Sequence, residues 1–385
     1  MLRIILTVTL VALASVALAA PEESTMMKAS LVSMGEVTPL QRVMARAQRG
    51  EPVVVGVIGG SITQGAAATK PEFRYGNRIA AWWQSTFPNS KIEFVNAGIG
   101  ATGSSYAVMR AERDLLSHKP DFVVVEFAVN DPKDRANAES YEGLVRQILR
   151  QPQAPAVVAL FMMTEDGGNA QEWQAQVGTH YNLPMVSYRD AIWGEMQAGR
   201  LEWADVSPDT VHPNDWGHEQ AAKFVTNLLE QVRAGMPKEL PAAAARVLPQ
   251  PLFSDLFDHT ALLEAPDLKP VSNQGWVLDE KLKAWKSDQP GSVIEFDIPG
   301  KLIYGAYYRL RGAMGKAKVT VDGGAPCVLD AWFDQTWGGY RQTWVLGKDL
   351  APGVHRVRVE LLEDKSPEST GHEFRLMGIS AAGVE

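Results

Sequence analysis

The chain has 385 residues, 45% of them hydrophobic, and a formal net charge of −8 at pH 7. This length and apolar content are enough for two domains with buried cores. The acidic balance and the absence of a basic run argue against a nucleic-acid partner. Cys327 is the only cysteine, which excludes an intramolecular disulfide and a thiolate metal cluster.

The first residues have the pattern of an export signal. Arg3 gives a short positive region, residues 4–16 are apolar, and Ala17-Leu18-Ala19 is a small-x-small cleavage site. The pattern predicts a signal peptide over residues 1–19 that is removed after Ala19. An uncleaved anchor helix is the alternative, but the apolar run is short for a membrane span. We therefore expect a secreted or periplasmic protein without membrane attachment after cleavage.

Patterns typical of helices and strands alternate between residues 38 and 232. Helical spacing of apolar residues predicts helices at 38–48, 75–87, 105–116, 138–150, 171–180, 190–197 and 216–232. Short apolar runs predict strands at 53–58, 91–95, 121–127, 155–161 and 185–187. This alternation indicates βαβ units in a three-layer domain with a parallel sheet.

Polar residues follow three of these strands directly. Ser61 comes after the first strand and Gly59-Gly60, the glycine-rich segment 96–104 follows the second, and Asn130 follows the third. Because right-handed crossovers place all strand-to-helix loops at one edge of a parallel sheet, we expect these residues to lie close together. A serine at such a turn also commonly caps a helix or closes the turn, so Ser61 alone does not establish an active site.

The pattern changes after residue 233. Residues 234–251 are rich in proline and alanine and are typical of a linker between a first domain, 20–233, and a second, 252–385. Short alternating runs follow without helices at 292–298, 302–310, 317–322, 327–333, 340–346 and 355–362, which indicates an antiparallel β-sandwich. Its many aromatic residues, Trp337 among them, either stack on sugars or fill the core, and the sequence leaves both interpretations open.

Two segments have the spacing of nucleotide-binding loops. Residues 60–65 match a phosphate-binding loop, but Ala66 and Ala67 stand where a lysine and a hydroxyl residue are needed. Residues 98–103 match G-x-G-x-x-G, with Glu126 at a tolerable distance, but they follow the second strand rather than the first. We therefore favour neither segment as a cofactor site.

An acid and a base lie close together later in the chain. Asp209 precedes His212 by three residues on a loop held by Pro208 and Pro213. Such a carboxylate can accept a hydrogen bond from one imidazole nitrogen and leave the other free as a base. The alternative is that Asp209 caps a turn beside a surface histidine. His218 lacks an acid at the same spacing, and the remaining histidines have no ligand-like neighbours, so no metal site is expected.

Four segments together resemble the blocks of the SGNH/GDSL hydrolase family. They are Gly59-Gly60-Ser61-Ile62-Thr63, Asn96-x-Gly98, Val129-Asn130-Asp131 and Asp209-x-x-His212-Pro213, in the family's order within residues 50–232. Gly60 stands where the family usually has aspartate, although GGSIT is a variant seen in its carbohydrate esterases. The family's oxyanion glycine falls on Ala101, directly after Gly100, so two residues remain candidates for this donor.

The resemblance implies a flavodoxin-like α/β/α hydrolase domain, followed here by a jelly-roll-like sandwich. It implies that Ser61 is the nucleophile, His212 its base and Asp209 the partner of the base. The oxyanion hole would be formed by Ser61, Gly100 or Ala101, and Asn130, and no cofactor or metal is needed. With the GGSIT form and the signal peptide, the resemblance indicates an exported esterase that removes acetyl groups from an oligo- or polysaccharide. A glycan acetyltransferase using the same residues and a non-catalytic glycan-binding protein are the alternatives.

Overall fold

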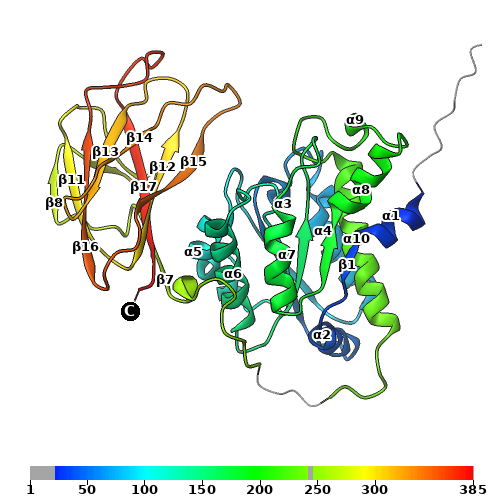
Figure 1. The fold of residues 1–385 in the computed structure, drawn as a ribbon. Coiled ribbons are helices and arrows are strands. Elements are labelled where there is room, and N and C mark those ends of the chain that lie inside the picture. Colours follow the sequence, from blue (N-terminus) through cyan, green and yellow to red (C-terminus); the bar gives the residue numbers. More distant parts are fainter. Residues whose placement is uncertain (1–21, 242–245, 385) are drawn as a thin grey trace, which may run out of the picture.

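The computed structural model describes residues 22–241 and 246–384. The predicted signal peptide lies outside the described residues, as do residues 242–245 of the predicted linker. An α/β domain and an all-β domain lie side by side (Figure 1).

A six-stranded sheet forms the centre of the first domain. Its order is β1-β6-β5-β4-β2-β3, and all neighbours are parallel except β1 and β6. The strands are β1 (Leu31–Ser33), β2 (Val53–Gly59), β3 (Ile92–Gly98), β4 (Phe122–Glu126), β5 (Ala156–Phe161) and β6 (Met185–Ser187). Strands β2 to β6 have the flavodoxin-like order, which confirms the predicted fold class. The sequence does not predict the antiparallel edge strand β1, because three residues are too few for a period to show.

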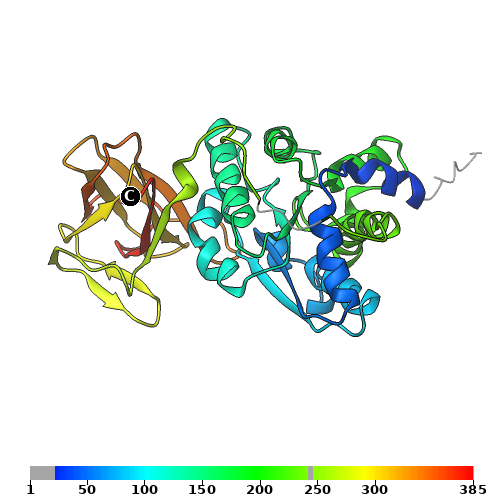
Figure 2. The same cartoon turned by 90° about the horizontal axis from the view of Figure 1, so that it is seen from below.

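Helices cover both faces of this sheet (Figure 2). The apolar sides of α2, α4, α8 and α10 form one core with the sheet, and those of α5, α6 and α7 form the other. In α10, for example, Phe224, Leu228 and Val232 recur every four residues and are buried. The helices are α1 (Glu23–Ser30), α2 (Thr38–Gln48), α3 (Ser61–Gln64), α4 (Tyr75–Thr86), α5 (Ser104–Asp114), α6 (Arg135–Leu149), α7 (Gln171–His180), α8 (Tyr188–Gln197), α9 (Trp203–Val206) and α10 (Asp215–Ala234).

Two antiparallel sheets form the second domain. One has the order β15-β12-β17-β10-β9, with β7 also paired to β17, and the other has the order β14-β13-β16-β11-β8. Every second residue of a strand faces the core between the two sheets. Along β11, these residues are Ile294, Phe296 and Ile298. The strands are β7 (Thr260–Glu264), β8 (Ser272–Gln274), β9 (Val277–Asp279), β10 (Ala284–Ser287), β11 (Val293–Pro299), β12 (Leu302–Arg309), β13 (Lys316–Val321), β14 (Cys327–Asp330), β15 (Tyr340–Gly347), β16 (Val354–Leu361) and β17 (Phe374–Ala382).

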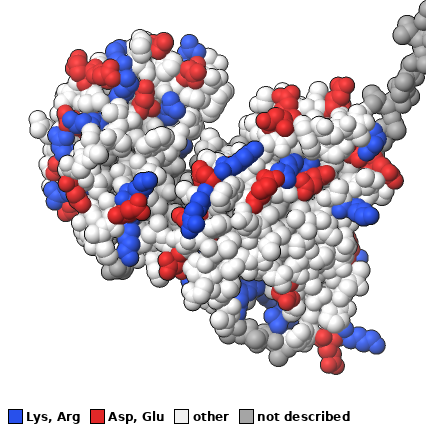
Figure 3. All heavy atoms as spheres, viewed as in Figure 1, with Lys and Arg blue, Asp and Glu red and all other residues white. Residues whose placement is uncertain are grey.

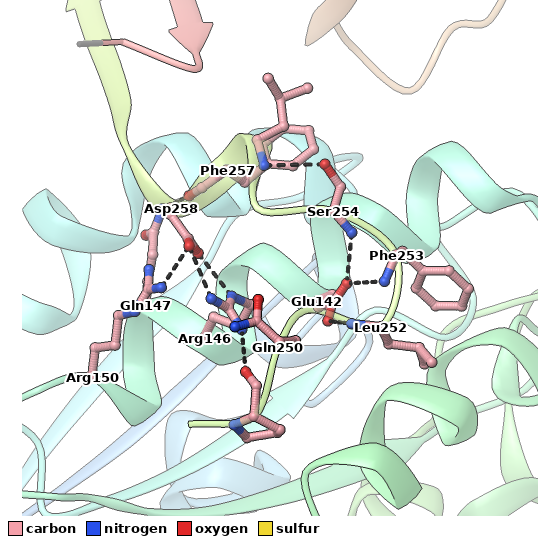
Figure 4. A network of polar contacts seen from close by, with 12 residues as sticks. Glu142, Arg146, Gln147, Arg150, Gln250, Leu252, Phe253, Ser254, Phe257 and Asp258 are labelled. Carbon is pink, nitrogen blue, oxygen red and sulfur yellow. Dashed lines mark hydrogen bonds and ion pairs between the residues drawn. The ribbon is translucent and has the colours of Figure 1, made fainter. Parts of the chain in front are cut away.

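The chain that enters the second domain is clamped to α6 (Figure 4). Glu142, fully buried, accepts hydrogen bonds from the backbone N–H groups of Leu252, Phe253 and Ser254 at 2.5, 2.8 and 3.2 Å. One turn further along, Arg146 forms two hydrogen bonds with Asp258, at 2.8 and 2.9 Å. These contacts fix the start of the sandwich against the first domain, and the two domains meet across a notch (Figure 3).

Candidate active site

Ser61 lies where the strand order of the sheet reverses. It is the first residue of α3, two residues after the end of β2. β2 lies between β3 and β4, and the helices that follow β2 and β4 pack on opposite faces of the sheet. The loops that leave these two strands therefore diverge at their carboxyl ends, which is where open α/β sheets bind their ligands. Asn130, four residues after β4, lies in the second of these loops.

The structure brings the side chains of Ser61, His212 and Asp209 together. His212 Nε2 lies 2.8 Å from Ser61 Oγ, and His212 Nδ1 lies 2.9 Å from Asp209 Oδ2. The acid and the base come from one loop and the hydroxyl from a turn 151 residues earlier in the chain. This geometry allows His212 to accept the proton of the Ser61 hydroxyl while Nδ1–H donates to the carboxylate.

The loop around Asp209 holds its carboxylate in the ionised form. Oδ1 accepts hydrogen bonds from the backbone N–H groups of Val211 and His212, at 2.8 and 2.7 Å. Partial burial works against ionisation, but the hydrogen bonds from His212 and Val211 outweigh it and lower the pKa of Asp209. An ionised partner fixes the tautomer in which Nε2 of His212 faces Ser61 as an acceptor.

Two residues that the sequence analysis missed support this loop. Ser207 Oγ lies 2.7 and 2.5 Å from the backbone oxygens of Asp209 and His212, so its one hydroxyl proton is within reach of both. Trp203, on the one-turn helix α9, donates from Nε1 to the backbone oxygen of Asp209 at 2.5 Å. A four-residue helix leaves no periodic signal in the sequence, so the role of Trp203 could not be predicted. For Ser207, the only signal is its position two residues before Asp209.

Asn130 packs against Gly60, the residue directly before Ser61. A Cβ atom on Gly60 would lie 2.1 Å from Asn130 Oδ1 and 3.0 Å from Nδ2. The glycine at this position, which departs from the usual family motif, therefore gives the Asn130 amide the space to lie beside Ser61. Asn130 Oδ1 is buried and has no partner among the described residues, so the amide is held by packing and by its backbone.

The two remaining oxyanion candidates differ in what their N–H groups bind. The N–H of Gly100 donates to Gln64 Oε1 at 3.0 Å. Ala101 adopts a left-handed conformation, with φ of 56°, and within the described part of the chain no acceptor is recorded for its N–H. Ala101 is thus the donor that is free to meet a ligand, whereas Gly100 must first release Gln64.

A closely packed polar cluster lies behind the Ser61 turn. The Thr63 hydroxyl lies 2.7 Å from the Tyr75 hydroxyl and donates to Glu126 at 3.4 Å. Burial raises the pKa of Glu126 to about 8, so its carboxyl is protonated at neutral pH. Glu126 is fully buried and therefore does not serve a ribose as a dinucleotide site would require.

Packing explains the glycines of the segment 98–103. A Cβ on Gly98 would lie 2.3 Å from the backbone of Gln64, and one on Gly103 would lie 2.6 Å from Asp131 Oδ1. These glycines let the loop after β3 approach α3 and the Asn130–Asp131 turn. Close backbone packing accounts for the G-x-G-x-x-G spacing without a phosphate.

His218, the alternative base, is buried and both of its ring nitrogens contact the backbone. It is fully buried, accepts from the N–H of Tyr75 at 3.4 Å and lies 3.1 Å from the oxygen of Ala66. Burial lowers the pKa of His218 to about 4, so the ring is neutral at physiological pH.

Within the described residues, no group of three or more His, Cys, Asp or Glu side chains is arranged to hold a metal. In the same part of the chain, no helix combines the length and the apolar character that a membrane span needs.

Comparison with known proteins gives a consistent result. The profile of the GDSL-like lipase/acylhydrolase family matches residues 57–220. A crystal structure of a two-domain esterase active on acetylated mannans is 33% identical, covering 93% of this chain and 99% of that chain with a TM-score of 0.86. A structure of a two-domain esterase active on acetylated mannans, co-crystallised with mannopentaose, is 33% identical over 93% of this chain and 98% of that chain, with a TM-score of 0.85. No curated protein matches.

The matched segment begins in β2 and ends in α10, so it spans Ser61, Asn130, Asp209 and His212. The similarity to the two-domain esterase extends further, through the sandwich. The chain belongs to the GDSL-like lipase/acylhydrolase family and is a two-domain esterase of that family.

Proposed function

We propose that the protein is an exported esterase that removes acetyl groups from mannan-type glycans by a Ser61–His212–Asp209 mechanism. The observation that carries this proposal is the continuous hydrogen-bonded path from Ser61 Oγ through His212 to Asp209, with distances of 2.8 and 2.9 Å. In this mechanism Ser61 Oγ attacks the ester carbonyl carbon, and its proton passes to His212 Nε2.

The oxyanion that forms is held by the N–H groups of Ser61 and Ala101 and by the side-chain amide of Asn130. When the tetrahedral intermediate collapses, the bond to the sugar oxygen breaks and that oxygen takes the proton from His212. A water molecule then repeats the sequence on the acetyl-enzyme and releases acetate. Removal of one oxyanion donor costs about 2.7–4 kcal/mol in other serine hydrolases, so each of the three contributes substantially.

The substrate proposal rests on the extent of the similarity. The esterase active on acetylated mannans resembles this chain over both domains, with 33% identity over 93% of this chain. Similarity limited to the hydrolase domain would support only that the substrate is an ester of some glycan, without identifying the glycan. A signal peptide over residues 1–19 fits a polymer substrate, because such a substrate lies outside the cytoplasm.

We further propose that the sandwich, residues 252–385, contributes to glycan binding. Phe333, Trp337 and Tyr340 form a cluster with ring centroids 5.0 and 5.7 Å apart, and Trp337 is 62% exposed. An exposed aromatic face of this kind stacks on sugar rings, whereas a core aromatic would be buried. The cluster adjoins the first residues of β15, a strand on the side of the sandwich that faces the first domain (Figure 1). Through Arg341, β15 contacts Tyr106 of α5.

The test is acetate release by purified residues 20–385 from acetylated mannan oligosaccharides and, for comparison, from acetylated xylan. We expect faster release from mannan and none by the Ser61→Ala variant. Acetate release by Ser61→Ala would contradict the proposed mechanism. Equal rates on the two glycans would contradict the proposal that mannan-type glycans are the substrate. Transfer of acetate to an added sugar in preference to water would identify an acetyltransferase, and binding without release would identify a glycan-binding protein.

A further inference from the structure

A fully buried arginine bridges the two strands that carry the Ser61 turn and the oxyanion loop. Arg110, on α5, has no exposed side-chain surface. Its guanidinium donates to the backbone oxygen of Gly59 at 3.2 Å and to that of Ala97 at 2.8 Å. Gly59 is the last residue of β2, two residues before Ser61, and Ala97 lies in β3, just before the loop of Gly100. One rigid planar group therefore ties together the ends of these two paired strands, at the point where the chain turns into the Ser61 and Gly100 loops.

The same guanidinium is held from the other side by a chain of ion pairs that reaches the sandwich. Arg110 donates to Asp114 at 3.0 Å, and Arg113 donates to the same carboxylate at 2.5 and 3.0 Å. Arg113 also donates to Glu264 of β7 at 2.6 Å. Arg341 of β15 donates to both oxygens of Glu264, at 3.2 and 2.9 Å. The chain thus runs from two sandwich strands to the residue that ends β2.

The Glu264–Arg341 pair of this chain is largely buried. The side chains of Glu264 and Arg341 are 18% and 16% exposed, and the ring of Tyr106 covers the pair from α5, with the Arg341 guanidinium 5.1 Å from its centroid. A buried ion pair adds little net stability compared with well-packed apolar residues, because desolvation offsets the attraction. Its contribution is geometric, because the Glu264 carboxylate accepts hydrogen bonds from Tyr106, Arg113 and Arg341 at once.

We infer that Arg110 is a positioning residue for Ser61 and that the sandwich, through Glu264, Arg113 and Asp114, helps to hold it in place. The inference rests on the proposed function, because it takes Ser61 as the nucleophile. Docking of the sandwich then fixes the distance between the nucleophile turn and the oxyanion loop, in addition to any contact with glycan. Such an effect appears in kcat for an ester too small to reach the sandwich, since misplacement by about 1 Å can cost up to ~100-fold.

The experiment measures kcat and KM for p-nitrophenyl acetate with Glu264→Gln and Arg113→Gln in the two-domain protein. Both substitutions keep a hydrogen-bonding side chain but remove one charge of the chain. The matched control is Asp258→Asn, which removes a carboxylate of similar burial, 10% exposed, from the clamp on α6 (Figure 4). Among the described residues, no recorded hydrogen bond or ion pair of Asp258 leads to Arg110. Ser61→Ala tests the proposed function separately.

We expect both chain variants to lose about tenfold in kcat with KM unchanged within about twofold, and Asp258→Asn to keep its kcat within about twofold. The double variant Glu264→Gln/Arg113→Gln should lose no more than the worse single variant, because both act through Asp114. Unchanged kcat in both variants, or an equal loss in Asp258→Asn, overturns the inference. If Ser61→Ala is inactive in the same assay, the proposed function stands regardless of that outcome. Should Glu264→Gln fail to fold, Arg113→Gln, at a 44% exposed side chain, carries the test alone.

Discussion

Substitution of Gly60 by alanine tests how the Asn130 amide is placed. The new Cβ would lie 2.1 Å from Asn130 Oδ1, whereas ordinary contact begins at 3.4 Å, so the amide must move by about 1.3 Å (3.4 − 2.1). The φ of Gly60 is negative, at −89°, and the three atoms nearest to the new Cβ all belong to the Asn130 side chain, so the clash falls first on that side chain. A displaced amide no longer meets the oxyanion. Because the loss of one such donor costs about 2.7–4 kcal/mol, we expect kcat to fall by about 100- to 1,000-fold.

The assay is the turnover of p-nitrophenyl acetate by Gly60→Ala, Asn130→Ala and the double variant, with thermal unfolding of each. If both substitutions remove the same donor, the double variant should be no slower than Asn130→Ala alone. Gly194→Ala is the matched control, because a Cβ on this α8 glycine would meet nothing within 4 Å. A wild-type kcat in Gly60→Ala, or losses that multiply in the double variant, would refute this role of Gly60.

Three further predictions follow from single residues. Asp209→Asn keeps an acceptor for the N–H groups of Val211 and His212 but presents an amide to His212 Nδ1. We expect kcat to fall on the order of 10³-fold or more while the circular dichroism spectrum stays normal. A loss below tenfold would contradict the proposed role of Asp209. Glu126 binds more protons in the native state than in the unfolded state between pH 4.5 and about 8, so its contribution lowers the free energy of unfolding as pH rises through that window. Glu126→Gln should reduce this slope, which can reach about 1.4 kcal/mol per pH unit, in urea unfolding at pH 5 and pH 8, and an unchanged slope would show that Glu126 is ionised in the native protein. Trp337→Ala should raise KM for acetylated mannan several-fold and leave p-nitrophenyl acetate turnover unchanged, and equal effects on both substrates would argue against glycan stacking.

The sequence predicts the first domain well because its signals are local. The apolar run of β2 and the four-residue spacing of α10 each identify an element without reference to the rest of the chain. The antiparallel strand β1 and the helix α9 were not predicted, because elements of three and four residues are shorter than a readable period. In the sandwich, β11 to β16 were predicted, but β8 has all three residues exposed and shows no alternation.

For the candidate site too, local signals could be read from the sequence and contacts between distant segments could not. Strand-end positions and the short spacing from Asp209 to His212 predict which residues meet, and the structure brings them within hydrogen-bonding distance. Contacts between distant segments have no such signal: the space that Gly60 leaves for Asn130 depends on how two loops from neighbouring strands pack. The same holds for Glu264, whose three partners come from α5 and β15.

The most direct test of the central claim is active-site labelling with a fluorophosphonate, followed by mass spectrometry of the digested protein. An activated serine reacts with this probe, whereas an ordinary surface serine does not. The account predicts one adduct per chain, on the peptide that contains Ser61, formed in step with the loss of esterase activity and strongly slowed in His212→Ala. An adduct on another serine, or full labelling of Ser61 with esterase activity retained, would contradict it.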